Sequence, residues 1–270
     1  MITAIVSKKG GVGKTTTCVN LAAALAGIGK KVLVVDLDSQ ASASLSLGVP
    51  REKLAPSVAD VLLHSMPIGE AIRPTRTGGL DVLPASSDLT SFDSIMASRP
   101  DKELILGRRL RDAQGFYDFI LLDCPSSLSL LPLSAMVAAD NFILPVVPQF
   151  LALEGARNLL PTAERLYQRF GKRTDLLGIV LTIVDYRTKT NRANIDLIRQ
   201  RFGNSVFAVE IRTNIRLAEA PSEGKSIFEY DPVCAGAKAY RLLAAEVLIR
   251  ASQLKRNTAA RQPQAATAAY

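Results

Sequence analysis

The sequence has one histidine, His64, and only three cysteines, Cys18, Cys124 and Cys234, none of them in a C-x-x-C pair. A single histidine argues against catalysis or a metal centre built on several imidazoles. Widely spaced cysteines indicate neither a disulfide framework nor a zinc site. We therefore expect each cysteine to be a small residue in or near the core.

Long apolar runs are also missing, since none reaches the ~18 residues of a transmembrane helix. The first apolar run is too short for a signal peptide and leads directly into a glycine-rich loop. We therefore expect a cytoplasmic protein. With 270 residues, of which 48% are hydrophobic, the chain can bury one large α/β core. Its net charge of +8 favours a polyanionic partner such as nucleic acid or an acidic membrane.

A glycine-rich loop, KKGGVGKTT, follows the apolar run Ile2–Val6. Its glycines let the backbone turn tightly and point N–H groups inward, and a helix that begins at Lys14 favours a bound phosphate at its N-terminus. In the standard P-loop this lysine reaches the β and γ phosphates, and the Thr15 hydroxyl holds Mg²⁺. The first glycine of the strict pattern is replaced by Lys8. We predict that the nucleotide contacts Gly10, Gly11, Val12, Gly13, Lys14, Thr15 and Thr16.

Strand and helix patterns alternate along the rest of the chain. Apolar strands such as KVLVVDLD, FYDFILLDCP and LLGIVLTIVD are separated by amphipathic helices, which predicts a mostly parallel twisted sheet with helices on both faces. The pattern is that of a single-domain P-loop NTPase of the α/β class, over residues 1–254. The stretch 255–270 is rich in Ala, Gln and Thr, and we expect it to be a disordered tail.

Two further segments bring carboxylates to the edge of the sheet where ligands bind in open α/β folds. Asp36 and Asp38 end the strand VLVVDLD, and Asp123 ends the strand FILLD. An acid in the place of Asp123 is the expected Walker B residue, which holds Mg²⁺ directly or through water. Of the other two, one can serve the metal and the other the attacking water, and the sequence does not rank them. The predicted metal ligands are Thr15, Asp36 and Asp123.

Several of these segments together resemble the ParA and MinD group of deviant Walker A ATPases. The resemblance rests on KGGVGKTT, VDLDSQ, DCPSSL, ALEG at 152–155 and RLAEAPSEGKSIFEYD at 216–231, and the last stretch is similar to the ParA/Soj branch. It implies an ATPase, slow without a partner, in which ATP closes two subunits into a sandwich dimer. Lys9 would then reach the phosphates of the partner subunit, and Asp38 would position the attacking water. The implied catalytic residues are Lys9, Lys14 and Asp38.

The resemblance also implies partners. ParA-like dimers loaded with ATP bind double-stranded DNA without sequence preference, and a ParB-like centromere-binding protein or another cargo adaptor stimulates hydrolysis and release. The protein would then be associated with the nucleoid and would segregate a chromosome or plasmid. By matching the ParA segments we favour Arg187 and Arg216 as DNA contacts. The wider set of basic candidates is Arg187, Lys189, Arg192, Arg212, Arg216, Arg250, Lys255 and Arg256.

This chain departs from the usual ParA pattern at three places. Serine replaces proline at Ser39 and Ser126, which leaves each switch loop less restricted. The usual IPRN reads IRTN at 211–214, a segment that the resemblance places near the adenine. The ATP preference is therefore implied by the family and not by a named residue.

Four alternatives remain open. A MinD-like membrane ATPase would need an amphipathic C-terminal helix with bulky apolar residues, and the tail NTAARQPQAATAAY has none. A nitrogenase-reductase-like carrier would need cluster-ligating cysteines in another arrangement. A small-molecule ligase of the same superfamily would transfer phosphate to a metabolite. Related ATPases also position other cargo, such as chemoreceptor clusters or carboxysomes. No helix-turn-helix precedes the P-loop, so we expect no operator-binding domain.

Overall fold

The computed structural model describes residues 1–127, 129–149 and 152–266. One sheet carries eight strands in the order β3-β4-β2-β5-β1-β6-β7-β8, and all its pairs are parallel except β3 with β4. The strands are β1 Ile2–Ile5, β2 Val32–Asp36, β3 Arg73–Pro74, β4 Leu80–Leu83, β5 Phe119–Asp123, β6 Asn141–Val146, β7 Asp175–Val184 and β8 Val206–Arg212.

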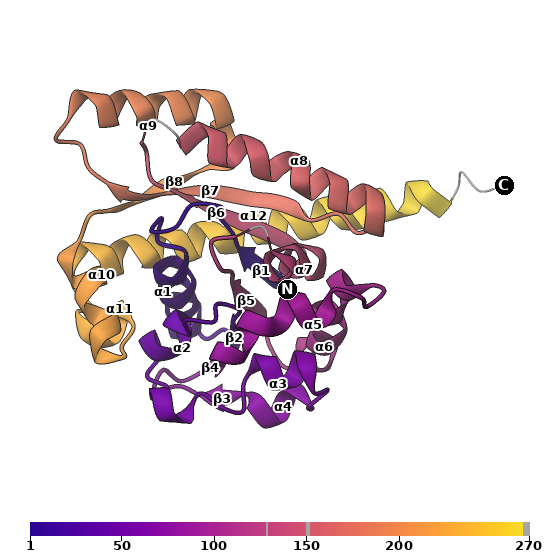
Figure 1. The fold of residues 1–270 in the computed structure, drawn as a ribbon. Coiled ribbons are helices and arrows are strands. Elements are labelled where there is room, and N and C mark those ends of the chain that lie inside the picture. Colours follow the sequence, from indigo (N-terminus) through magenta and orange to yellow (C-terminus); the bar gives the residue numbers. More distant parts are fainter. Residues whose placement is uncertain (128, 150–151, 267–270) are drawn as a thin grey trace.

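Helices cover both faces of this sheet (Figure 1). They are α1 Lys14–Gly27, α2 Ser42–Ser46, α3 Val58–Leu63, α4 Ile68–Ala71, α5 Phe92–Met96, α6 Ile105–Gln114, α7 Leu130–Ala138, α8 Ala152–Phe170, α9 Lys189–Phe202, α10 Ile215–Glu219, α11 Ile227–Tyr230 and α12 Ala235–Ala266. The predicted α/β class is confirmed.

The alternation of strand residues explains the two-faced core. Val32 and Val34 of β2 pack into the cluster shared with α1 and α12, whereas Leu33 and Val35 pack into the cluster on the α6 and α7 face. All four are fully buried. Successive side chains of a strand point to opposite faces, so a strand covered on both sides must be apolar throughout. This is why the near-continuous apolar runs could be assigned to a parallel sheet.

The strand order places the chemistry-bearing segments side by side. β5 lies between β1 and β2, and the register pairs Ile5 with Asp123 and Asp36 with Asp123. The loops after β1, β2 and β5 therefore leave the sheet together at its carboxyl edge. Ligands of open α/β sheets bind at this edge.

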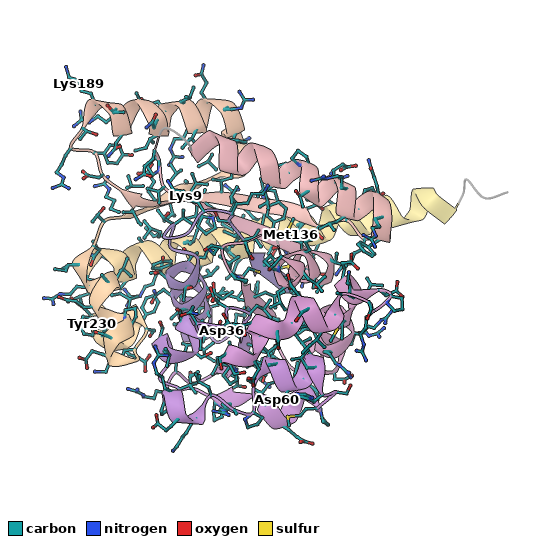
Figure 2. The ribbon with its side chains drawn as sticks, viewed as in Figure 1. Lys9, Asp36, Asp60, Met136, Lys189 and Tyr230 are labelled. Atoms are coloured by element: carbon teal, nitrogen blue, oxygen red, sulfur yellow. The ribbon has the colours of Figure 1, made fainter. Side chains whose placement is uncertain are left out.

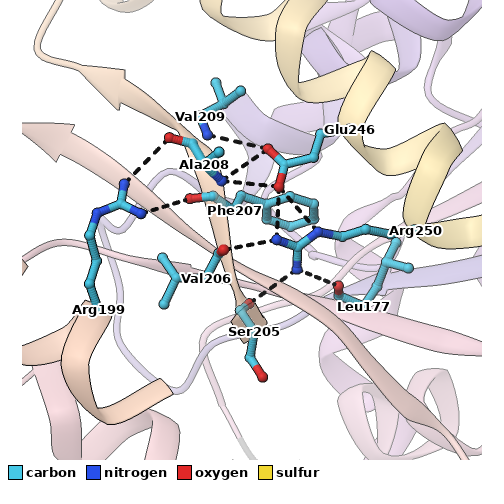
Figure 3. Close-up of polar contacts among 9 residues, drawn as sticks. All are labelled: Leu177, Arg199, Ser205, Val206, Phe207, Ala208, Val209, Glu246 and Arg250. Carbon is cyan, nitrogen blue, oxygen red and sulfur yellow. Dashed lines mark hydrogen bonds and ion pairs between the residues drawn. The ribbon is translucent and has the colours of Figure 1, made fainter. Parts of the chain in front are cut away.

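The long helix α12 is fixed to the far edge of the sheet by Arg250 (Figure 3). Its guanidinium lies 4.2 Å from the centre of the Phe207 ring and donates to the carbonyls of Leu177 and Val206, at 3.2 and 2.8 Å. It also donates to the Glu246 carboxylate, at 2.8 Å. Although Arg250 was a candidate for DNA contact, its charge is turned into the fold.

We expect Arg250→Ala to lower the free energy of unfolding by about 2 kcal/mol, because it removes the cation that pairs with the half-buried Glu246 carboxylate and donates to two carbonyls. Chemical denaturation monitored by circular dichroism measures this. Arg256→Ala, at an exposed position on the same helix, is the matched control and should leave stability unchanged. Equal midpoints for the two variants would contradict this role of Arg250.

Helix α12 continues to Ala266 and so includes residues 255–266 of the segment that composition predicts to be disordered. Residues 267–270 lie outside the described residues. Alanine, glutamine, lysine and arginine, which dominate this stretch, are strong helix formers, so a helix already started at Ala235 extends readily through the residues before Pro263. The compositional prediction did not weigh this propensity.

Candidate nucleotide site

The glycine-rich loop turns between β1 and α1 as predicted. Gly11 and Gly13 have φ of +70° and +79°, values that residues with a Cβ rarely adopt. Gly13 directly precedes α1, so the first N–H groups of that helix face the loop. The local sequence thus builds a nest of N–H groups at a helix N-terminus, which binds anions.

Thr182 of β7 holds this loop from the neighbouring side. Its hydroxyl donates to the Val12 carbonyl at 2.8 Å, and a Cβ added to Gly13 would lie 3.8 Å from its side chain. The next residue, Ile183, has φ of +51° where the β7–β8 register is irregular. This is a rare conformation for a β-branched residue and it re-aims the strand end. No local sequence pattern indicates this support, because Thr182 and Val12 are 170 residues apart.

Lys14 lies beside the loop and is only 6% exposed. Its ammonium donates to the Ser126 hydroxyl and to the Lys9 carbonyl at 3.4 Å. Burial lowers the pKa of Lys14, while the nearby Asp123 raises it. A buried ammonium that holds only neutral oxygens is ready to exchange them for phosphate oxygens.

Thr15 and Asp123 meet as the P-loop motif requires. The Thr15 hydroxyl donates to Asp123 Oδ2 at 2.7 Å, and the buried Oδ1 of Asp123 has no hydrogen-bond partner. Burial and the neighbouring Asp36 carboxylate raise the pKa of Asp123. A divalent cation would relieve this repulsion and use the orphaned oxygen, so the residues present fit Mg²⁺.

The carboxylate of Asp36 is fully buried and already engaged. Its Oδ2 accepts from the N–H and the hydroxyl of Ser44, at 2.8 and 2.7 Å, and its Oδ1 accepts from the Asp38 N–H at 3.1 Å. Burial raises the pKa of Asp36 to about 6 against the opposing effect of these bonds. Asp36 therefore shapes the loop after β2, and it does not line the cavity described next.

A cavity of about 310 Å³ lies over the loop. Asp38 lines it, together with Lys14, Thr15, Thr16 and Ser126. Asp38 Oδ1 accepts from the Gln40 N–H at 3.0 Å, which fixes the carboxylate beside the phosphate end of the cavity. The structure therefore separates the two acids that the sequence could not rank, because Asp38 faces the cavity and Asp36 does not.

The opposite wall of the cavity comes from the segment before α11. Ala220, Pro221 and Lys225 line it, whereas residues 211–214 do not. The segment IRTN therefore does not line this cavity, and its expected place near the adenine stays a prediction. Asn20 of α1 holds this wall in place: its Oδ1 accepts from the Ile227 N–H at 2.7 Å.

Lys9 does not line the cavity. Its side chain is exposed, and its ammonium donates to Gln149 Oε1 at 2.7 Å. Figure 2 shows Lys9 in the loop above α1, while Asp36 lies deeper, beside α2. A charge placed here is available to a second molecule at the same surface.

The two arginines predicted to contact DNA lie far from the loop in sequence and both carry acidic partners. Arg187, 86% exposed, forms an ion pair with Asp185 at 2.6 Å. Arg216 pairs with Glu219 at 2.9 Å and with Asp231 at 3.6 Å. Both side chains reach the surface, but part of their charge is already compensated.

Two negative findings apply to residues 1–127, 129–149 and 152–266. No helix there combines the length and the apolar content needed to cross a membrane. In the same part of the chain, no three His, Cys, Asp or Glu side chains gather as a metal site.

Comparison with known proteins agrees with this geometry. Residues 1–176 match the family model described as an AAA domain. The chain is 40% identical over 255 residues to the chromosome partitioning protein ParA of Caulobacter vibrioides, covering 92% of this chain and 94% of that protein. It is 42% identical over 248 residues to the sporulation initiation inhibitor protein Soj of Bacillus subtilis, covering 91% and 97%.

Among solved structures, the chain is similar to cobyrinic acid a,c-diamide synthase from Mycobacterium smegmatis with bound ADP and magnesium. The TM-score is 0.79 at 33% identity, over 92% of this chain and 93% of that one. That protein holds its nucleotide and magnesium on the same fold.

Proposed function

Because the chain belongs to the ParA and Soj family of chromosome-partitioning P-loop ATPases, we propose that it hydrolyses ATP with Mg²⁺ and uses the cycle to position DNA. ATP closes two copies into a homodimer, and the dimer binds nucleoid DNA without sequence preference. A ParB-like adaptor then stimulates hydrolysis and release. One observation carries the proposal. The cavity is lined by the residues of a phosphate site, while Lys9, in the same loop, does not line it and instead donates to Gln149.

The residues of the cavity divide the work of phosphoryl transfer to water. The loop N–H groups and Lys14 bind the β and γ phosphates and neutralise their charge. Thr15 and Asp123 would hold Mg²⁺, which supplies further positive charge to the phosphates. Asp38, which has one oxygen held by Gln40, orients the attacking water with the other. Lys9 of the second copy adds the charge that the closed site still needs.

We predict that Asp38→Ala separates binding from hydrolysis. The variant should bind ATP and dimerise, because Lys14, Thr15 and the loop N–H groups are unchanged, but it should remain on DNA since water is no longer oriented. Sedimentation velocity with ATP and with ADP measures the dimer, and phosphate release measures turnover. Asp36→Asn is the contrasting variant, because it changes the carboxylate that holds Ser44 in the loop after β2 and leaves Asp38 in place. An Asp38→Ala protein that stays monomeric with ATP would remove this role.

DNA binding is expected to depend on Arg187 and Arg216. Replacing either by alanine should weaken binding to a nonspecific duplex several-fold and reduce the slope of log K against log salt by about one, as for the loss of one phosphate contact. Arg108→Ala is the matched control, because Arg108 is also an exposed, ion-paired arginine but belongs to α6. An unchanged salt slope in both variants would place the DNA surface elsewhere.

A second candidate comes from the similarity to the diamide synthase, which favours a small-molecule ligase on the same nucleotide site. A ligase activates an acceptor and turns over little ATP without it. ATP hydrolysis that rises with DNA and an adaptor protein, and not with a carboxylate-bearing metabolite and an amine donor, favours the positioning ATPase. The opposite dependence would favour the ligase. The same hydrolysis assay, with the stimulating partner varied, also tests for a MinD-like membrane cycle and for other cargo.

A further inference from the structure

Ser126 lies three residues beyond Asp123, in the loop that leaves β5. Its hydroxyl accepts a hydrogen bond from the Lys14 ammonium and lines the nucleotide cavity. A Cβ added to Gly10 would lie 3.7 Å from the same hydroxyl oxygen. Ser126 therefore stands over the phosphate loop, across the cavity from the N-terminus of α1.

The place of this hydroxyl follows from that of Lys14. The P-loop lysine reaches the β and γ phosphates, so a hydroxyl that its ammonium holds lies close to where these phosphates bind. A serine hydroxyl has one hydrogen to donate and two lone pairs. Ser126 accepts from Lys14, so its own hydrogen can be donated into the cavity that it lines.

We propose that Ser126 is an additional γ-phosphate contact that distinguishes ATP from ADP. In the empty site it holds Lys14; when ATP enters, Lys14 turns to the phosphates and the Ser126 O–H donates to the terminal one. A proline at position 126 would have neither the hydroxyl nor an N–H and could do neither. The proposal rests on the nucleotide-binding function above and names a residue that reads the third phosphate.

The proposed hydrogen bond would also affect the loop that leaves β5. Ser126 precedes α7, whose first N–H, that of Leu130, donates to Asp93 at 3.2 Å. A hydrogen bond from Ser126 to the γ-phosphate would fix the start of this connection only while ATP is intact.

The test is the ratio of ATP to ADP affinity in Ser126→Ala. Titration calorimetry with Mg²⁺, using ADP and a non-hydrolysable ATP analogue, gives both dissociation constants. Loss of the empty-state contact with Lys14 affects both nucleotides equally and cancels in the ratio. Loss of the γ-phosphate contact weakens only the ATP analogue, by about tenfold, the scale for one hydrogen bond to a charged acceptor. Ser126→Thr keeps the hydroxyl and should restore the ratio.

Ser127→Ala is the matched control, because Ser127 is the exposed neighbour and its hydroxyl pairs with that of Ser129 at 2.8 Å. Its ratio should equal that of the unchanged protein. A Ser126→Ala ratio that also equals it would overturn the proposal while leaving the ATPase assignment intact. If the unchanged protein binds neither nucleotide, the ATPase assignment fails, and the proposal fails with it.

Discussion

Replacing Lys14 by alanine is expected to weaken ATP binding by at least about 100-fold, because the ammonium makes charge-assisted hydrogen bonds to two phosphates. This ammonium is buried, and it donates to the Ser126 hydroxyl and the Lys9 carbonyl. Its removal should therefore cost the fold little compared with the site. Titration with a fluorescent ATP analogue and thermal denaturation measure the two effects separately.

The control for this variant is Lys31→Ala, an exposed lysine directly before β2, at the opposite edge of the sheet. It should bind ATP as the unchanged protein does. Should Lys14→Ala retain ordinary affinity while folding normally, the loop would not be a phosphate site, and the ATPase assignment would have to be abandoned.

The second large effect is expected from Lys9→Ala. This variant should bind ATP with normal affinity, since Lys9 does not line its own cavity, yet it should lose hydrolysis by ~10³-fold, as when a charge supplied in trans is removed. Gln149→Ala is the matched control because it removes the partner that holds Lys9 in the empty protein, without removing the charge. It should hydrolyse ATP at close to the normal rate.

A mixing experiment decides whether Lys9 acts across the dimer. Neither Lys9→Ala nor Asp38→Ala hydrolyses ATP alone, but in a mixed dimer the Lys9→Ala subunit keeps its own Asp38 and receives Lys9 from its partner. One working site is thereby rebuilt, and part of the activity should return on mixing. If mixing restores nothing while mixed dimers form, Lys9 would have to act within its own subunit.

The features of the site that could be predicted were those set by local sequence and strand order. The loop with its glycines, Lys14 and Thr15 is a contiguous motif, and Asp123 had to end a strand beside it once the sheet was parallel. The direction of Lys9, in contrast, was implied by resemblance alone. Its exposed side chain is consistent with that implication, and its action on a partner stays a prediction.

Other features were beyond the sequence because they depend on contacts between distant segments. Asn20 fixes the cavity wall through Ile227, and Thr182 supports Val12 from 170 residues away. Asp36 and Asp38 are the same residue type at similar positions after β2. They differ because the N–H and the hydroxyl of Ser44 lie beside Asp36 and donate to its carboxylate. Tertiary placement of a hydrogen-bond donor cannot be read from periodicity.

Some helices were predictable but not predicted. Helix α6 places Leu106, Leu110 and Ala113 on one buried face, a helical spacing that the sequence displays. Helix α3 begins with a capping box, in which Ser57 and Asp60 bond to each other's N–H groups. Both lie between the motifs on which the functional argument rested, and a uniform scan for caps and periodicity would have found them.

The central claim is that ATP switches DNA binding on. Its most direct test is the affinity for a nonspecific duplex with no nucleotide, with ADP and with ATP, each at two salt concentrations. We expect binding only with ATP, weakened by the higher salt because the contacts are to phosphates. Equal binding in all three nucleotide states, or none in any of them, would contradict it.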